Sequence, residues 1–184
     1  IKVASDQGGI TPLQEVVLRA AARAHLRTGT PISTHTWSPE RVGEQQVRIL
    51  EEEGVDLTRV YIGHSNDDTD LDYLLGLLGK GVWLGLDRYP GGRVPGTPKW
   101  EQRTETAKKL IDAGFCHRIM LSHDYSVPKA RNGAQAQEEH RRANPDGYNF
   151  ILRKVLPRLK ELGASDADIQ QLMVENPRRF FEGT

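Results

Sequence analysis

Five short apolar segments recur along the chain, and each is followed by a segment with helical periodicity. The apolar segments read IKVA from Ile1, PISTHT from Pro31, RVYIGH from Arg59, GVWLGLD from Gly81 and RIMLSHD from Arg118. Each has the length of a strand and is rich in Ile, Val, Leu or aromatic residues. Nearly continuous apolar strands that alternate with helices indicate parallel βαβ units with both sheet faces covered.

The intervening segments carry helix start and stop signals. Capping residues precede Pro12 and Leu71, Ser38-Pro39 has the form of a helix start, and glycines follow several periodic stretches. The predicted helices cover residues 12–29, 39–54, 70–79, 100–114 and 148–162. We expect the last of these to be broken or kinked at Pro157. A final helix is predicted after Ser165, which resembles a capping box with Asp168.

Composition excludes several classes of protein. The chain has 184 residues, enough for one domain, with 25 basic and 25 acidic side chains. This balance does not suit a nucleic-acid partner, and the apolar runs are too short to span a membrane. Cys116 is the single cysteine, so no internal disulfide or thiolate cluster is expected and a reducing, cytoplasmic location is predicted. We expect Cys116 to be a small buried filler and not a nucleophile.

Polar residues lie in or at the ends of the predicted strands. They are Lys2, His35, His64, Asp87 and Asp124. A doubly wound sheet and a (β/α)8 barrel both fit the alternation of elements. In a barrel the carboxyl ends of all strands meet on one face, so these five groups would converge. Two neutral imidazoles and a carboxylate suit Zn, Fe, Co or Mn, which predicts a metal site.

Several motifs occur in one order over nearly the whole chain. They are IKVAS, TPLQEVVLRAAARAH, STHT, YIGHSND, GLDRY, LSHDY and NPRRFF. Together they resemble the phosphotriesterase family of the amidohydrolase superfamily. The resemblance implies a metal-dependent hydrolase with a (β/α)8 barrel fold. Residues 1–184 would then be the C-terminal portion of the barrel, with its last five βα units and without strands one to three.

The resemblance also implies roles for individual residues. Lys2 would be carbamylated and, together with a hydroxide, would bridge two divalent ions such as zinc, cobalt, iron or manganese. His35 and His64 would bind the more exposed ion. Asp124 would bind the buried ion and collect the proton of the attacking hydroxide. Asp67 matches an acid that passes this proton outward.

Two departures from phosphotriesterases proper resemble the phosphotriesterase-like lactonases. The dipeptide Asp87-Arg88 stands where the former have Asp-His, and His123 stands where they have Asn. The expected activity is opening of acyl-homoserine or other γ- and δ-lactones, with weaker hydrolysis of organophosphate triesters. We expect Trp37, Arg88 and Tyr89 to bind the substrate, and Arg88 to take part in catalysis with Asp124 and Asp67. Family members are commonly homodimers, so a homodimer is expected.

Some alternatives remain open from the sequence. Asp87 could cap a turn or pair with Arg88, and Arg88 could hold a loop or line the pocket. The family's His-x-His pair does not occur in this sequence, and we expect it to belong to an N-terminal half missing from this chain or supplied by another. The activity could also be that of a true phosphotriesterase or carboxylesterase, or the chain could be an inactive half-barrel.

Overall fold

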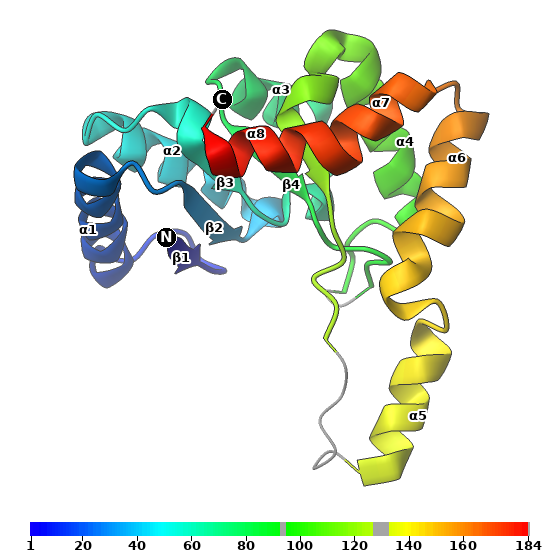
Figure 1. Cartoon of the computed structure of the whole chain (residues 1–184). Helices are drawn as coiled ribbons and strands as arrows, with labels where there is room; N and C mark the ends of the chain where they lie inside the picture. The colour runs from blue at the N-terminus through cyan, green and yellow to red at the C-terminus, as the bar shows by residue number, and fades with distance from the viewer. Residues whose placement is uncertain (93–94, 127–132, 184) are drawn as a thin grey trace.

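The computed structural model describes residues 1–92, 95–126 and 133–183. Its centre is a parallel sheet of five strands in the order β1-β2-β3-β4-β5 (Figure 1). The strands are β1 (Lys2–Ser5), β2 (Ile32–Thr36), β3 (Val60–Ile62), β4 (Trp83–Leu86) and β5 (Ile119–Leu121). All five predicted strands are therefore present, and each pairs with the strand next to it in sequence.

Four α-helices lie in the connections between consecutive strands, one in each connection. They are α1 (Pro12–Thr28), α2 (Val42–Glu52), α3 (Leu71–Gly79) and α4 (Trp100–Leu110). Thr11 and Gln14 form a capping box at the start of α1, and Gly29 ends it with a left-handed φ of 68°. Asp70 caps α3 by accepting hydrogen bonds from the backbone N–H groups of its first turn.

The predicted start of the second helix was wrong. Ser38-Pro39 forms a short 3₁₀ turn, Ser38–Glu40, and the α-helix begins at Val42. Arg41 separates the two with a left-handed φ of 54°, which breaks the helical path. Proline fits the first turn of either helix type, so the dipeptide alone could not tell them apart.

The C-terminal region is helical with irregular turns. Its helices are α5 (Gly133–Ala143), α6 (Leu156–Glu161), α7 (Asp166–Gln170) and α8 (Asn176–Glu182). A π-helical turn, Ile151–Val155, ends immediately before α6, which contains Pro157. The expected irregularity at this proline is confirmed, because proline lacks the N–H that regular helix bonding requires. The capping box of Ser165 and Asp168 is also confirmed.

The two faces of the sheet pack against different elements. One face contributes residues such as Ile32, Ile62 and Leu84 to a large core shared with α1 to α4. On the other face, Trp83 and Met120 pack against Phe180 of α8, which crosses the sheet in Figure 1. The ring centroids of Trp83 and Phe180 lie 5.9 Å apart. Since β1 and β5 each pair with one strand in the described ranges, the sheet is open.

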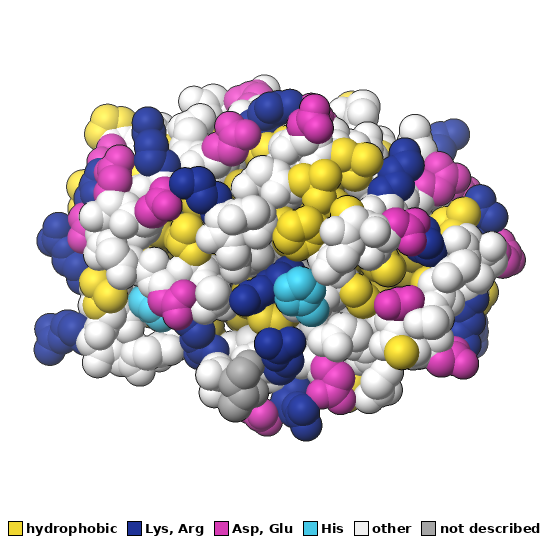
Figure 2. All heavy atoms as spheres, turned by 90° about the horizontal axis from the view of Figure 1, so that it is seen from above, with side chains coloured by type: hydrophobic (Ala, Val, Ile, Leu, Met, Phe, Trp, Pro, Cys, Tyr) yellow, Lys and Arg dark blue, Asp and Glu magenta, His cyan; other side chains and the backbone are white. Residues whose placement is uncertain are grey.

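Basic and acidic side chains are mixed over the surface shown in Figure 2, with hydrophobic side chains between them. This distribution agrees with the equal numbers of the two charge types in the chain. Among the described residues, the structure contains no helix with the length and apolar character needed to cross a membrane.

Replacing Leu84 with alanine should lower the free energy of unfolding by about 2–5 kcal/mol, because the side chain is fully buried in the main core. Leu152, which is 57% exposed, provides the matched control, and its replacement should change stability by less than about 0.5 kcal/mol. Urea unfolding of both variants measures the difference. Equal losses would contradict the assignment of Leu84 to the core.

Candidate active site

A hollow of about 430 Å³ opens on the sheet face that packs against α8, and it reaches the carboxyl ends of the strands. Four of the predicted site residues line it: Lys2, His64, Asp87 and Asp124. They come from β1 and from the residues that follow β3, β4 and β5. The parallel sheet therefore brings together four of the five strand-associated residues that the sequence singled out, and the fifth, His35, contacts His64.

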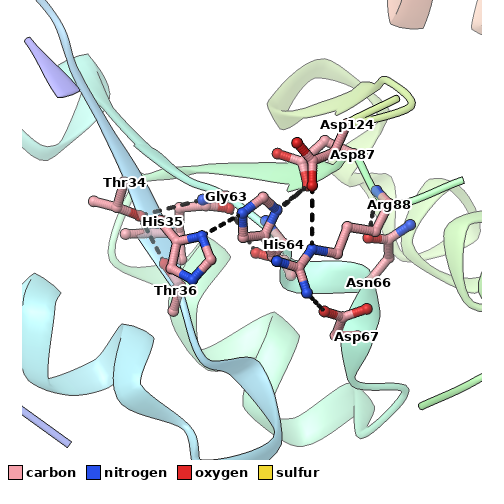
Figure 3. Close-up of polar contacts among 12 residues, drawn as sticks. Thr34, His35, Thr36, Gly63, His64, Asn66, Asp67, Asp87, Arg88 and Asp124 are labelled. Carbon is pink, nitrogen blue, oxygen red and sulfur yellow. Dashed lines mark hydrogen bonds and ion pairs between the residues drawn. The ribbon is translucent and has the colours of Figure 1, made fainter. Parts of the chain in front are cut away.

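His35 and His64 form the centre of this group (Figure 3). Nδ1 of His35 lies 2.8 Å from Nε2 of His64, and Nδ1 of His64 lies 2.8 Å from Oδ1 of Asp87. The Asp87 carboxylate is an acceptor, so it favours a proton on Nδ1 of His64 and leaves the lone pair on Nε2. Asp87 thereby sets both the tautomer and the orientation of the His64 ring.

Asp87 is held from three directions. Its Oδ1 also accepts a hydrogen bond from the backbone N–H of His64 at 2.8 Å, and its Oδ2 accepts one from the Tyr61 hydroxyl at 2.8 Å. Burial, reinforced by the Asp87 charge, raises the pKa of Tyr61 well above its usual value, so this hydroxyl stays protonated as a donor. Asp87 thus supports His64. Its carboxylate contacts His64 and Tyr61, where the sequence had left open a pair with Arg88.

Arg88 points to two other carboxylates. Its Nη1 donates to Oδ2 of Asp67 at 2.7 Å, and its Nε lies 3.6 Å from Oδ2 of Asp124. The side chains of Arg88 and Asp67 are 11% and 4% exposed, whereas that of Asp124 is 42% exposed. Arg88 therefore connects a buried carboxylate to one that faces the hollow.

Two residues of the site have an unusual backbone conformation. His64 has a φ of 62° and Asp124 a φ of 43°, both in the left-handed region that non-glycine residues rarely adopt. Both follow a strand and turn the chain sharply there. Such local strain tends to occur where a side chain must be aimed at a functional site.

Lys2 is exposed and His35 is half-buried, and both have altered proton affinities. Nζ of Lys2 donates to the carbonyl oxygen of Thr34 at 2.7 Å. Burial lowers the pKa of Lys2, although the charges of Asp87 and Asp124 oppose the change. Burial and the neighbouring His64 lower the pKa of His35, which favours its neutral, ligand-competent form.

Residues 1–181 match the model of the phosphotriesterase family. The chain belongs to this family. The phosphotriesterase homology protein of Mycobacterium tuberculosis is 42% identical to it over 99% of this chain and 54% of the relative. The aryldialkylphosphatase of Saccharolobus solfataricus is 38% identical over 98% of this chain and 57% of the relative. The N-acetyltaurine hydrolase of Dictyostelium discoideum is 33% identical over 93% of this chain and 46% of the relative.

The fold agrees with that of a solved family member. The structure of the phosphotriesterase from Mycobacterium tuberculosis matches with a TM-score of 0.86 and 40% identity, over 98% of this chain and 54% of the other. This chain therefore spans about half the length of the relatives it matches. The five parallel βα units fit part of the predicted (β/α)8 barrel.

The donor atoms suit the metal chemistry of a phosphotriesterase-type site, although the described residues do not form a complete shell. Within residues 1–92, 95–126 and 133–183, no three His, Cys, Asp or Glu side chains cluster closely enough to hold one ion. His35 and His64 nevertheless lie side by side, with Nδ1 of one 2.8 Å from Nε2 of the other, and imidazole nitrogens are common ligands of zinc. The hydrogen bond from His64 to Asp87 is the support that metal-binding histidines usually have.

The three residues predicted to bind the substrate are not among those that line this hollow, although Arg88 faces Asp124 at its border. Tyr89 is 1% exposed and belongs to the main core, where burial raises its pKa to about 12. Trp37 lines a neighbouring hollow of about 340 Å³ with Asp67 and residues 95–98. Tyr89 is thus placed to support the loop that follows it, whereas Trp37 lies beside the Asp67 end of the site. Residues 93–94 of this loop lie outside the described residues.

The sequence interpretation overlooked Arg103 of α4. Its side chain is 0% exposed and its Nη1 lies 2.8 Å from Oδ1 of Asp67. The available signal was its position: Arg103 shares the buried face of α4 with Ala107 and Leu110. A charged residue on an apolar helix face requires a buried partner, and this one binds the acid that also binds Arg88.

Cys116 should react slowly with thiol reagents, because burial raises its pKa to about 12. Its Sγ also lies 3.7 Å from the carbonyl oxygen of Asp168. At pH 8 we expect alkylation of the Cys116 peptide, followed by mass spectrometry, to be at least about 100-fold slower in the folded protein than in guanidinium chloride. Comparable rates would show that this thiol is not protected by the fold.

Proposed function

We propose that the protein containing this chain is a binuclear metal-dependent hydrolase that opens lactones and also hydrolyses organophosphate triesters. The observation that carries the proposal is the contact of His35 with His64, which Asp87 orients, beside a hollow that Lys2 and Asp124 also line. Membership of the phosphotriesterase family supports hydrolysis as the reaction class. We further propose that residues 1–184 form strands four to eight of the barrel and their helices.

In this proposal Lys2, His35, His64 and Asp124 hold the two divalent ions, with Lys2 carbamylated. When bound, the ions supply Lewis acidity and lower the pKa of a water molecule from 15.7 towards roughly 7. Asp124 accepts the proton that is released as water adds to the substrate carbonyl. Its half-exposed carboxylate can then pass the proton on to solvent.

The other residues orient these groups. Asp87 and Tyr61 keep the Nε2 lone pair of His64 available by fixing its ring. Arg88 faces Asp124 with its positive charge, since its Nε lies 3.6 Å from Oδ2 of Asp124. The tethered alkoxide of an opened lactone stays in the product, so the reaction yields a hydroxy acid.

Arg88 and His123 support a lactone as the preferred substrate, because they occupy the positions where the chain departs from phosphotriesterases proper. The tetrahedral intermediate of lactone hydrolysis resembles a phosphotriester in shape, which would account for a side activity on triesters. The relative named aryldialkylphosphatase supports triester hydrolysis as the alternative main activity. A cytoplasmic homodimer is part of the same proposal.

The full-length protein, purified without chelator, should contain about two divalent ions per chain and should lose its activity on dialysis against a chelator. Assays with an acyl-homoserine lactone, a γ-lactone and an aryl dialkyl phosphate should give the highest kcat/KM for a lactone. Asp124→Asn, compared at equal metal content, should lower kcat by about 100-fold or more. Hydrolysis of an N-acetyl amide alone, or full activity without metal, would overturn the proposal.

Asp87→Asn should weaken divalent-metal binding by about 10- to 100-fold, because the amide no longer imposes one tautomer on His64. Competition between the full-length protein and a chromophoric chelator for zinc measures this change. Asp72→Asn is the matched control, since Asp72 is an exposed residue of α3. If both variants bind zinc as tightly as the unmodified protein, Asp87 does not support a metal ligand.

A further inference from the structure

Arg103 lies fully buried beneath the site, where a guanidinium needs several partners to offset the loss of water. Its Nη1 donates to the carbonyl oxygen of Asn66 at 2.6 Å and its Nε to that of Pro98 at 2.8 Å. The same Nη1 lies 2.8 Å from Oδ1 of Asp67. Arg103 therefore ties α4 to the turn after β3 and to the loop after β4.

The backbone of Gly91 packs directly against this guanidinium. A Cβ atom at position 91 would lie 2.6 Å from Nε of Arg103, and Gly91 has a φ of 93°. A side chain there would collide with the arginine and would also be strained in this conformation. The loop after β4 is thus shaped around Arg103.

Asp67 divides its two oxygens between two arginines. Oδ1 pairs with Arg103, and Oδ2 accepts a hydrogen bond from Nη1 of Arg88 at 2.7 Å. An unhindered arginine and carboxylate tend to form a bidentate pair, here through Nη2 together with Nη1 or Nε, and such a pair would need both oxygens of Asp67. Because Oδ1 is already occupied, Arg88 binds Asp67 through Nη1 and keeps its Nε directed at Asp124, as Figure 3 shows.

We propose that Arg103 is a positioning residue of the active site. By occupying one oxygen of Asp67, it holds Arg88 in the orientation that faces Asp124. The formal charges of Arg103, Asp67, Arg88 and Asp124 sum to zero, so the row of four is balanced. Asp67 then lies between the guanidinium groups of Arg103 and Arg88. Arg88, whose guanidinium stays charged in proteins, lies between the carboxylates of Asp67 and Asp124. The effect on catalysis rests on the proposed function of Asp124.

The proposal predicts that Arg103→Lys lowers kcat of the full-length enzyme by about 10- to 100-fold and changes KM by less than about threefold. Lysine keeps the charge but cannot maintain all three contacts from one ammonium group. Lys109→Gln is the control, because it removes a positive charge from an exposed position on the same helix. It should leave both constants unchanged.

A double-mutant cycle with Arg88→Lys separates positioning from a general structural role. If Arg103 acts through Arg88, the double variant should be about as slow as Arg88→Lys alone, and the two losses should not multiply. Multiplicative losses would overturn the proposal. If Arg103→Lys does not fold, Gly91→Ala replaces it in the cycle, since it displaces the same guanidinium from the loop side.

Hydrogen exchange provides a readout that does not depend on activity. Arg103→Lys should speed amide exchange of residues 64–68 and 87–92 relative to Lys109→Gln, while the strands keep their protection. Absence of any difference would overturn the positioning role. If the enzyme hydrolyses neither lactones nor triesters, the proposed function fails, and the exchange comparison still decides whether Arg103 organises these two loops.

Discussion

The parallel pairing of five short strands is the constraint on which the rest of the molecule depends. Each strand has only three to five residues, and all run in one direction. Their carboxyl ends therefore lie along one edge, and Lys2 and Asp124, which are 122 positions apart, line one hollow. The alternation of side chains along a strand sends neighbouring residues to the helical core instead.

Two buried polar networks organise this edge. In one, Tyr61 and the backbone of His64 hold Asp87, and Asp87 orients the His64 ring. In the other, Arg103 and Arg88 share the carboxylate of Asp67. Buried charges are costly unless every one is paired, so such networks contribute less to stability than to a unique arrangement of the groups they hold. Both networks act on residues that face the hollow.

The fold was largely predictable from local patterns. The strands, the caps at Thr11 and Ser165 and the irregular helix near Pro157 all follow from short-range backbone and side-chain preferences. The error at Ser38-Pro39 has the same origin, since proline begins 3₁₀ and α-helices alike and the left-handed Arg41 gave no sequence signal. Tyr89 was expected to bind the substrate, whereas its side chain is buried in the main core.

The sequence alone determined the alternation of elements, the residue types at the strand ends and, through its motifs, the family. These features depend on local propensity and on residue identity, and both can be read from the sequence without knowing which residues are in contact. Only the tertiary structure decided that Asp87 supports His64 instead of pairing with Arg88, and that Arg103 shares Asp67 with Arg88. These contacts join separate βα units, and they depend on distances that the packing of helices against the sheet sets.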